Sequence, residues 1–324
     1  MGFQRKLLRR AISQNLKYPL NLKLWNLLGE PPITVTFTGG LGAQVISTAI
    51  YEKLKSVGLP VCADFSYFNG LHKINNGDPL GGISKFPWQL DEIGYSQASF
   101  NTLSPTSVPW FAIDDGPVKM GLFLEAVSDP GVRLKLSTVN RPDLIRDLLP
   151  GQLSAKRYGC VHIRRGDYLS VASHIVTDSL LAKACDAWGV DEGMVVVLSD
   201  SPIAQETRDL FRRISGRHFV FADAVSPISS FVIMQNSKYL ICSNSQFSLS
   251  AGMCAGLPML IPSRWYSYPN KKRYSRSRHG RLAHIEDLLF MSSDFVLVNQ
   301  PSYGVQRLNP ITDVRSFCKF VAQI

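Results

Sequence analysis

The sequence lacks long apolar runs. A membrane-spanning helix needs about 18 consecutive apolar residues, whereas the longest apolar runs in this chain, such as residues 194–198, have the length of a strand. The basic N-terminus is followed by a polar stretch, residues 13–18, where a secretion signal would have its apolar core. We therefore expect a cytoplasmic protein, soluble or held peripherally at the inner face of a membrane.

The motifs of several enzyme classes are also absent. The sequence has no Gly-x-x-x-x-Gly-Lys-Ser/Thr loop, no His-Glu-x-x-His pair and no Gly-x-Ser-x-Gly elbow, which argues against a P-loop NTPase, a zinc protease and an α/β-hydrolase. It has no Asp-x-Asp sequence and no Cys-x-x-Cys pair, so we expect neither a bound metal ion nor a cofactor. The six scattered cysteines are expected to be reduced thiols, several of them buried.

Basic residues are in excess. The chain has 35 Lys and Arg against 25 Asp and Glu, a formal net charge of +10, which favours anionic partners. Residues 3–28 have the spacing of a basic amphipathic helix and fit a surface helix or a peripheral membrane anchor. The basic run from Lys271 to Arg281 fits a solvated loop, a contact with a membrane or a lipid-linked diphosphate, or a nucleic-acid site. We do not expect nucleic acid to be the partner.

Alternating strands and helices predict an α/β fold with parallel sheets. Residues 33–38 form a strand that leads into a glycine turn, a helix through Leu54 and a second strand at 60–63. Residues 66–130 are rich in Gly, Pro, Asn and Ser, which is typical of irregular loops.

In the second half, strands are predicted at 158–163, 194–198, 218–221, 239–242 and 257–261. Helices are predicted at 179–188, at 228–236, at 243–255 and in a segment ending at Arg213. This alternation indicates a parallel sheet covered on both faces. The break at Leu149-Pro150-Gly151 divides the chain into two domains, residues 1–150 and 151–324.

Three polar segments directly follow predicted strands, where ligands bind in parallel sheets. They are Arg164-Arg165-Gly166-Asp167, Ser199-Asp200 and Ser243-Asn244-Ser245. Forked arginine donors suit a pyrophosphate, and a helix that begins after the third segment offers backbone N–H groups to phosphate. The alternative is structural: an ion pair of Asp167 with one of the arginines.

The glycine turn admits a second interpretation. Gly39-Gly40-Leu41-Gly42 follows a strand and precedes a helix, and Asp64 ends the next strand, which partly matches a dinucleotide-binding fingerprint. The third glycine is missing, and Val45 occupies the position where the motif has a small residue for close packing of the helix. A nicotinamide-dependent oxidoreductase is therefore a weaker alternative.

Five segments in order resemble the α1,2-fucosyltransferases, glycosyltransferase family 11, within the fucosyltransferase superfamily that carries a His-x-Arg-Arg-Gly-Asp motif. The string from His162 to Tyr168 is similar to the family's His-x-Arg-Arg-Gly-Asp-Tyr. Its companions are Gly39-Gly40-Leu41-Gly42-Ala43-Gln44, Leu198-Ser199-Asp200, Ser243-Asn244-Ser245-Gln246-Phe247-Ser248 and Ile261-Pro262-Ser263-Arg264-Trp265-Tyr266.

The resemblance implies a GT-B-like fold, with two Rossmann-like domains and a cleft between them, residues 1–150 on the acceptor side and 151–324 binding the donor. It implies metal-independent transfer of fucose from GDP-fucose, with inversion, to a hydroxyl such as galactose O2 of a glycan or lipid-linked glycan. Arg164 would be catalytic at the β-phosphate. The implied donor-binding residues are His162, Arg165, Asp167, Ser199, Asp200, Ser243, Asn244, Ser245, Phe247 and Ser248, with Gly39, Gly40, Gly42 and Gln44 at the cleft.

Two departures from the family pattern leave the donor open. Ala43 stands where the family has Asn, and Ser229-Ser230 where it usually has an acid suited to guanine. One alternative is the same fold and mechanism with another nucleotide sugar. An alternative of another class is a non-catalytic protein that binds anions or nucleic acid through the basic run.

Overall fold

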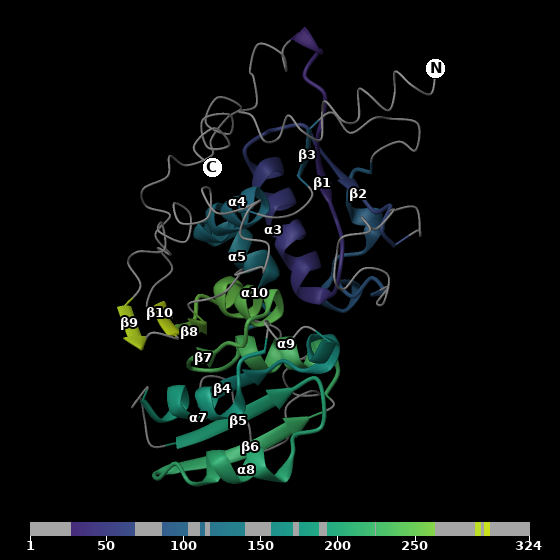
Figure 1. Ribbon diagram of the computed structural model, residues 1–324. Helices are drawn as coiled ribbons and strands as arrows, with labels where there is room; N and C mark the ends of the chain where they lie inside the picture. Colours follow the sequence, from purple (N-terminus) through teal and green to yellow (C-terminus); the bar gives the residue numbers. More distant parts are fainter. Residues whose placement is uncertain are drawn as a thin grey trace, which may run out of the picture.

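The computed structural model describes residues 27–68, 86–102, 111–113, 117–139, 157–170, 175–187, 193–223, 225–262, 289–292 and 295–298. Its strands form two β-sheets, one from each half of the chain, with helices packed on them (Figure 1). The prediction of an α/β protein is confirmed.

The smaller sheet has three parallel strands in the order β2-β1-β3. They are β1 (Ile33–Thr36), β2 (Val61–Asp64) and β3 (Phe111–Ile113). All of β1 is buried because it is the central strand. Helix α3 (Leu41–Ser56) follows β1 after the glycine turn, so the predicted succession of strand, turn and helix is confirmed.

Residues 66–130 contain more regular structure than predicted. Helix α4 (Pro117–Ser128) lies there with the short 3-10 helices η1 (Asp91–Ile93) and η2 (Gln97–Ser99), and α5 (Pro130–Leu136) follows. The prediction of irregular loops was wrong for α4. Residues 122–124, 126 and 127 are all buried, and a helix buried on several sides shows no alternation of apolar and polar residues at helical spacing.

The larger sheet has seven strands in the order β6-β5-β4-β7-β8-β10-β9. The bounds are β4 (Tyr158–Ile163), β5 (Gly193–Ser199), β6 (Arg217–Asp223), β7 (Leu240–Ile241), β8 (Met259–Pro262), β9 (Leu289–Ser292) and β10 (Phe295–Val298). The first five strands are parallel, and the last two pair antiparallel. The strand order reverses between β4 and β7, and such a reversal leaves room for a ligand beyond the carboxyl ends of the two strands.

Helices cover both faces of this sheet, as predicted. They are α7 (Asp178–Ala187) and α8 (Gln205–Arg212) on one face, and α9 (Pro227–Gln235) and α10 (Gln246–Ala255) on the other. In β4, Tyr158 and Cys160 pack into the core that includes α9 and α10, whereas Val161 and Ile163 pack with α7 and α8. His162 follows Cys160 by two residues and so faces α9 and α10.

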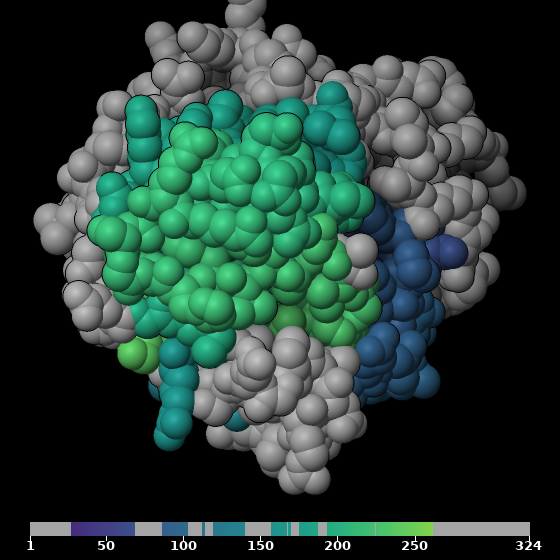
Figure 2. All heavy atoms as spheres, turned by 90° about the horizontal axis from the view of Figure 1, so that it is seen from below, coloured from purple at the N-terminus to yellow at the C-terminus, as the bar shows by residue number. Residues whose placement is uncertain are grey.

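Helix α10 joins the two halves of the chain. It packs against α3 and α5, and buried residues of both halves form one hydrophobic core. Seen from below, the teal and green atoms of the larger-sheet half lie beside the blue atoms of the smaller-sheet half (Figure 2). The predicted boundary at 149–151 lies outside the described residues, and the cleft between two domains stays a prediction.

The two basic segments of the sequence lie mostly outside the described residues. These are most of residues 3–28 and all of the basic run 271–281. Among the helices that the structure describes, none has the length and apolar character of a membrane span. The described cysteines are buried and free of disulfides, as expected: Cys62, Cys160, Cys185, Cys242 and Cys254.

Candidate functional site

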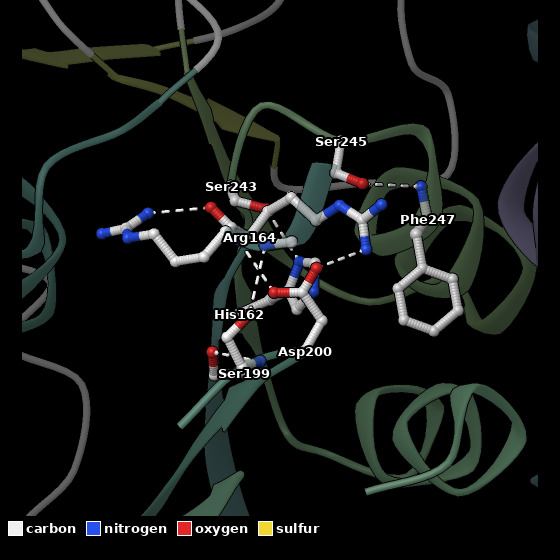
Figure 3. A network of polar contacts seen from close by, with 10 residues as sticks. His162, Arg164, Ser199, Asp200, Ser243, Ser245 and Phe247 are labelled. Carbon is white, nitrogen blue, oxygen red and sulfur yellow. Dashed lines mark hydrogen bonds and ion pairs between the residues drawn. The ribbon is translucent and has the colours of Figure 1, made fainter. Parts of the chain in front are cut away.

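Polar residues of three separate segments meet where the strand order reverses. β4 ends at Ile163 and leads into Arg164, while β7 ends at Ile241 and leads into Ser243. Ser199 closes β5 on the other side of β4. Figure 3 shows the resulting cluster, in which His162, Arg164, Ser199, Asp200, Ser243, Ser245 and Phe247 lie close together. The structure thus brings together the three polar segments that the sequence singled out.

His162 connects β4 to the segment after β7. Its Nδ1 lies 2.8 Å from Ser243 Oγ, and its side chain is buried. Burial, reinforced by the positive charges of Arg164 and Arg165, lowers the pKa of His162 to about 3. The imidazole is therefore neutral at physiological pH, and it binds Ser243 as an uncharged group.

Asp200 fixes the side chain of Arg164. Arg164 Nη1 donates to Asp200 Oδ2 at 2.5 Å, and the Arg165 backbone N–H donates to Asp200 Oδ1 at 2.8 Å. The Arg164 guanidinium also lies over the Tyr168 ring, 5.2 Å from its centroid. The carboxylate and the aromatic ring together restrict the directions in which this guanidinium can point.

The turn that carries Asp200 is itself held against the loop after β4. Ser201 donates its backbone N–H to Ser199 Oγ at 3.1 Å, and the Gly166 N–H donates to Ser201 Oγ at 3.2 Å. Gly166 has a φ of +28°, and a methyl group there would stand 2.5 Å from Asp200 Oδ2. Glycine at this position is what lets Asp200 come close to the arginines.

Arg165 is held by Asp178, a residue that the sequence analysis did not single out. Its Nη2 forms an ion pair with Asp178 at the start of α7, and its Nη1 donates to the Arg164 carbonyl at 2.8 Å. The side chain of Asp167, the partner suggested by the sequence, lies outside the described residues. The role of Asp178 was not predicted, although an acidic residue at the start of a predicted helix can be recognised in the sequence.

The N-terminus of α10 completes the cluster. Ser245 is its N-cap and accepts the Phe247 backbone N–H at 3.2 Å. The Ser248 hydroxyl donates to the Ser245 carbonyl at 3.4 Å. Asn244 is buried, and its Oδ1 accepts no hydrogen bond from the residues that the structure describes. A buried acceptor without a hydrogen bond lowers the stability of the fold unless a ligand or a water molecule donates to it.

The glycine turn of the smaller sheet reaches this helix. A methyl group on Gly42 would stand 2.5 Å from Phe247 Cα, so backbone packs on backbone. The Phe247 ring in turn lies edge-on to His162, with ring centroids 5.5 Å apart. Where a dinucleotide-binding turn would face a pyrophosphate, Gly42 faces protein, which weighs against the oxidoreductase alternative.

Gln44 anchors the glycine turn from within α3. Its Nε2 donates to the carbonyls of Gly39 and Pro87, both at 2.9 Å, and its Oε1 accepts the Gln89 N–H at 2.9 Å. The side chain is fully buried. Its amide is therefore committed to holding the backbone, and Gly40 lies beside the Phe86 ring in the segment so held.

The site can present fixed positive groups to an anion. Among the residues that the structure describes, Arg164 pairs with Asp200 and Arg165 with Asp178, so a carboxylate holds each guanidinium. The guanidinium N–H groups and the N-terminus of α10 are oriented donors that suit an anion.

Comparison with known proteins relates the part of the chain that holds the site to a known family. No curated protein and no solved structure matches the chain. The model of glycosyl transferase family 11 matches residues 143–280, which include β4 to β8 and the segments around Arg164, Asp200 and Ser245. Residues 143–280 are therefore similar to family 11, a glycosyltransferase family of the fucosyltransferase type, and this similarity identifies the chain as a glycosyltransferase.

Proposed function

We propose that the enzyme transfers fucose from GDP-fucose to a hydroxyl of a glycan acceptor, galactose O2 being the first candidate, with inversion and without a metal ion. The observation that carries the proposal is the position of Arg164. It stands at the reversal of strand order, held by Asp200, within the segment that matches family 11. Its guanidinium is suited to the β-phosphate of a nucleotide sugar.

In the proposed reaction, the acceptor hydroxyl attacks the anomeric carbon from the face opposite the phosphate. The bond from that carbon to the phosphate oxygen breaks, GDP leaves with the bonding electrons, and the proton of the acceptor hydroxyl passes to water. Negative charge grows on the departing phosphate, and Arg164 stabilises it together with the N-terminus of α10. Because the pKa of His162 is about 3, we assign it to positioning through Ser243 rather than to proton transfer.

The remaining predicted residues have supporting roles in this scheme. Arg165 holds the Arg164 backbone, Ser199 shapes the turn that carries Asp200, and Asn244 offers a buried acceptor to the donor. The glycine turn supports α10 from the smaller sheet. The acceptor side of the site is assigned to the first half of the chain, and contact with a membrane through residues 3–28 or 271–281 stays a prediction.

Replacement of Arg164 tests the proposal. In Arg164→Ala we expect transfer from GDP-fucose to fall by about 10²–10³-fold, as for loss of one oriented donor in a transition state. Arg212→Ala is the matched control, because Arg212 is paired with Asp209 on the exposed surface of α8. Full transfer by Arg164→Ala, or absence of GDP binding by the unaltered protein, would overturn the assignment.

The α9 segment supports a second candidate, another nucleotide-sugar donor. Its first turn carries Ser229 and Ser230, with Ser226 as N-cap, and no acidic residue. The first turn of α9 therefore has no carboxylate that could accept a hydrogen bond from guanine. Titration with GDP, UDP and dTDP decides between the donors.

A further inference from the structure

Three side chains from different elements form a continuous chain beneath Arg164. Thr207 Oγ1 of α8 donates to Asp178 Oδ2 at 2.5 Å, and the other oxygen of Asp178 pairs with Arg165 Nη2. Arg165 Nη1 then donates to the Arg164 carbonyl at 2.8 Å. The hydrogen-bonded series therefore runs from α8 through α7 to the backbone of Arg164, the residue that we assign to the donor phosphate.

The surroundings of this hydrogen-bonded series of side chains favour a fixed geometry. The Thr207 side chain is buried, and the Arg165 and Asp178 side chains are only 16% and 28% exposed. Each carboxylate oxygen of Asp178 accepts from a donor, Oδ1 from Arg165 and Oδ2 from Thr207. A carboxylate held at both oxygens cannot rotate, so it determines where the Arg165 guanidinium lies.

Two carboxylates hold different parts of the loop after β4. Asp200 holds the Arg164 side chain and the Arg165 N–H, while Asp178 holds the Arg165 side chain. We propose that Asp178 and Thr207 are positioning residues, which act through Arg165 to fix the Arg164 backbone for phosphate stabilisation. This inference rests on the proposed function, because it explains why Arg165 contacts the carbonyl of Arg164, the residue that this function places at the donor phosphate.

Without Asp178, the Arg165 guanidinium loses the ion pair that fixes its position. An Arg165 guanidinium freed from Asp178 competes with Arg164 for Asp200, whose Oδ1 already accepts the Arg165 backbone N–H. Arg164 then loses its orientation although neither Arg164 nor Asp200 has changed. Displacement of a catalytic group by about 1 Å costs up to about 10²-fold in rate.

The experiment compares Thr207→Val with Thr207→Ser and adds Asp178→Asn. Thr207→Val keeps the shape of the side chain but removes the hydroxyl, whereas Thr207→Ser keeps the hydroxyl. Asp209→Asn is the matched control, because Asp209 lies two residues further along α8 and pairs with Arg212 on the surface. kcat, the KM for GDP-fucose and the midpoint of thermal unfolding are measured for each protein.

We expect kcat to fall about tenfold or more in Asp178→Asn and by a smaller factor in Thr207→Val, with wild-type kcat in Thr207→Ser and Asp209→Asn. The double variant Asp178→Asn with Arg165→Lys should be no slower than the slower single variant, because both changes break one chain. A role in folding alone predicts lower midpoints, unchanged kcat in the folded fraction and additive effects, and that result would overturn the proposal.

Failure of the inference is separable from failure of the proposed function. If Arg164→Ala is inactive while Asp178→Asn and Thr207→Val keep wild-type kcat, the function stands and the positioning role is wrong. If Arg164→Ala retains full transfer, the assignment of Arg164 fails, and with it the reason for the chain.

Discussion

Gly42 lies against the backbone of Phe247, with room for a hydrogen atom and nothing larger. An added methyl carbon would stand 2.5 Å from Phe247 Cα and 2.6 Å from its nitrogen. The contact joins the turn after β1 to the first turn of α10, which belongs to the other sheet's half of the chain. The N-terminus of α10 is therefore positioned from both halves.

Replacement of Gly42 by Ala should weaken nucleotide binding. The new methyl group meets backbone rather than a flexible side chain, so the turn or α10 has to move, and overpacking of this kind costs roughly 1–3 kcal/mol of stability. We expect a lower midpoint of thermal unfolding and weaker GDP binding by calorimetry.

Gly193→Ala is the control for Gly42→Ala. Gly193 lies at the exposed start of β5, and a methyl group there meets no atom within 4 Å. Equal GDP affinity in the two variants would show that the contact with Phe247 is irrelevant to the nucleotide site.

The buried His162 predicts a loss of stability in acid. Its pKa is about 3 in the folded protein and about 6.5 when unfolded, so between these values the unfolded chain binds the additional proton. The stability contributed by neutral His162 is therefore complete above about pH 6.5 and declines as the pH falls towards 3, by at most about 1.4 kcal/mol per pH unit. Urea unfolding at pH 7 and pH 5 measures the slope.

His162→Asn separates this effect from other titrations. Asn keeps a polar group for Ser243 but does not titrate, whereas Asp129 and Asp223, whose pKa values are also lowered, are present in both proteins. We expect a smaller loss of stability between pH 7 and pH 5 in the variant. The same loss in both proteins would contradict the assigned pKa of His162.

Asp200→Asn should separate binding from catalysis. The change removes a negative charge next to the bound phosphate, so we expect GDP to bind as well as before or better. The Arg164 guanidinium loses its charged partner, so kcat for transfer should fall by roughly tenfold or more. Parallel weakening of GDP binding and kcat would mean that Asp200 supports the whole loop and not the orientation of Arg164.

Gln44→Leu tests the anchor of the glycine turn. The variant leaves the Gly39 and Pro87 carbonyls and the Gln89 N–H without the partners they have in α3. Since each buried polar group left unpaired costs about 1–3 kcal/mol, we expect a loss of at least roughly 2 kcal/mol in urea unfolding. Gln205→Leu, at an exposed position of α8, should change stability by less than about 0.5 kcal/mol.

The succession of strands and helices in residues 158–262 was predictable to within one or two residues at most ends. Buried parallel strands are short apolar runs, and here each one is followed by polar or turn residues, so both the strand and its end are visible in the sequence. Helix α4 was not predictable in this way, because it is apolar on several sides and its start follows a segment without clear periods.

The residues of the candidate site were visible in the sequence, but their partners were not. Arg164, Asp200 and Ser243 follow predicted strands, and parallel strands bring their carboxyl ends to one edge. Which carboxylate holds which arginine depends on side-chain reach across neighbouring elements, and the structure pairs Arg164 with Asp200 and Arg165 with Asp178.

By itself, the sequence determined the kinds of elements, the edge at which polar groups gather and the resemblance to family 11, because these depend on local patterns and short strings. Only the tertiary structure decided that His162 is held by Ser243, that Asp178 and Thr207 stand behind Arg165, and that Gly42 supports α10. Each of these contacts joins residues far apart in the chain, and its existence depends on packing distances of a few ångströms, which no local pattern encodes.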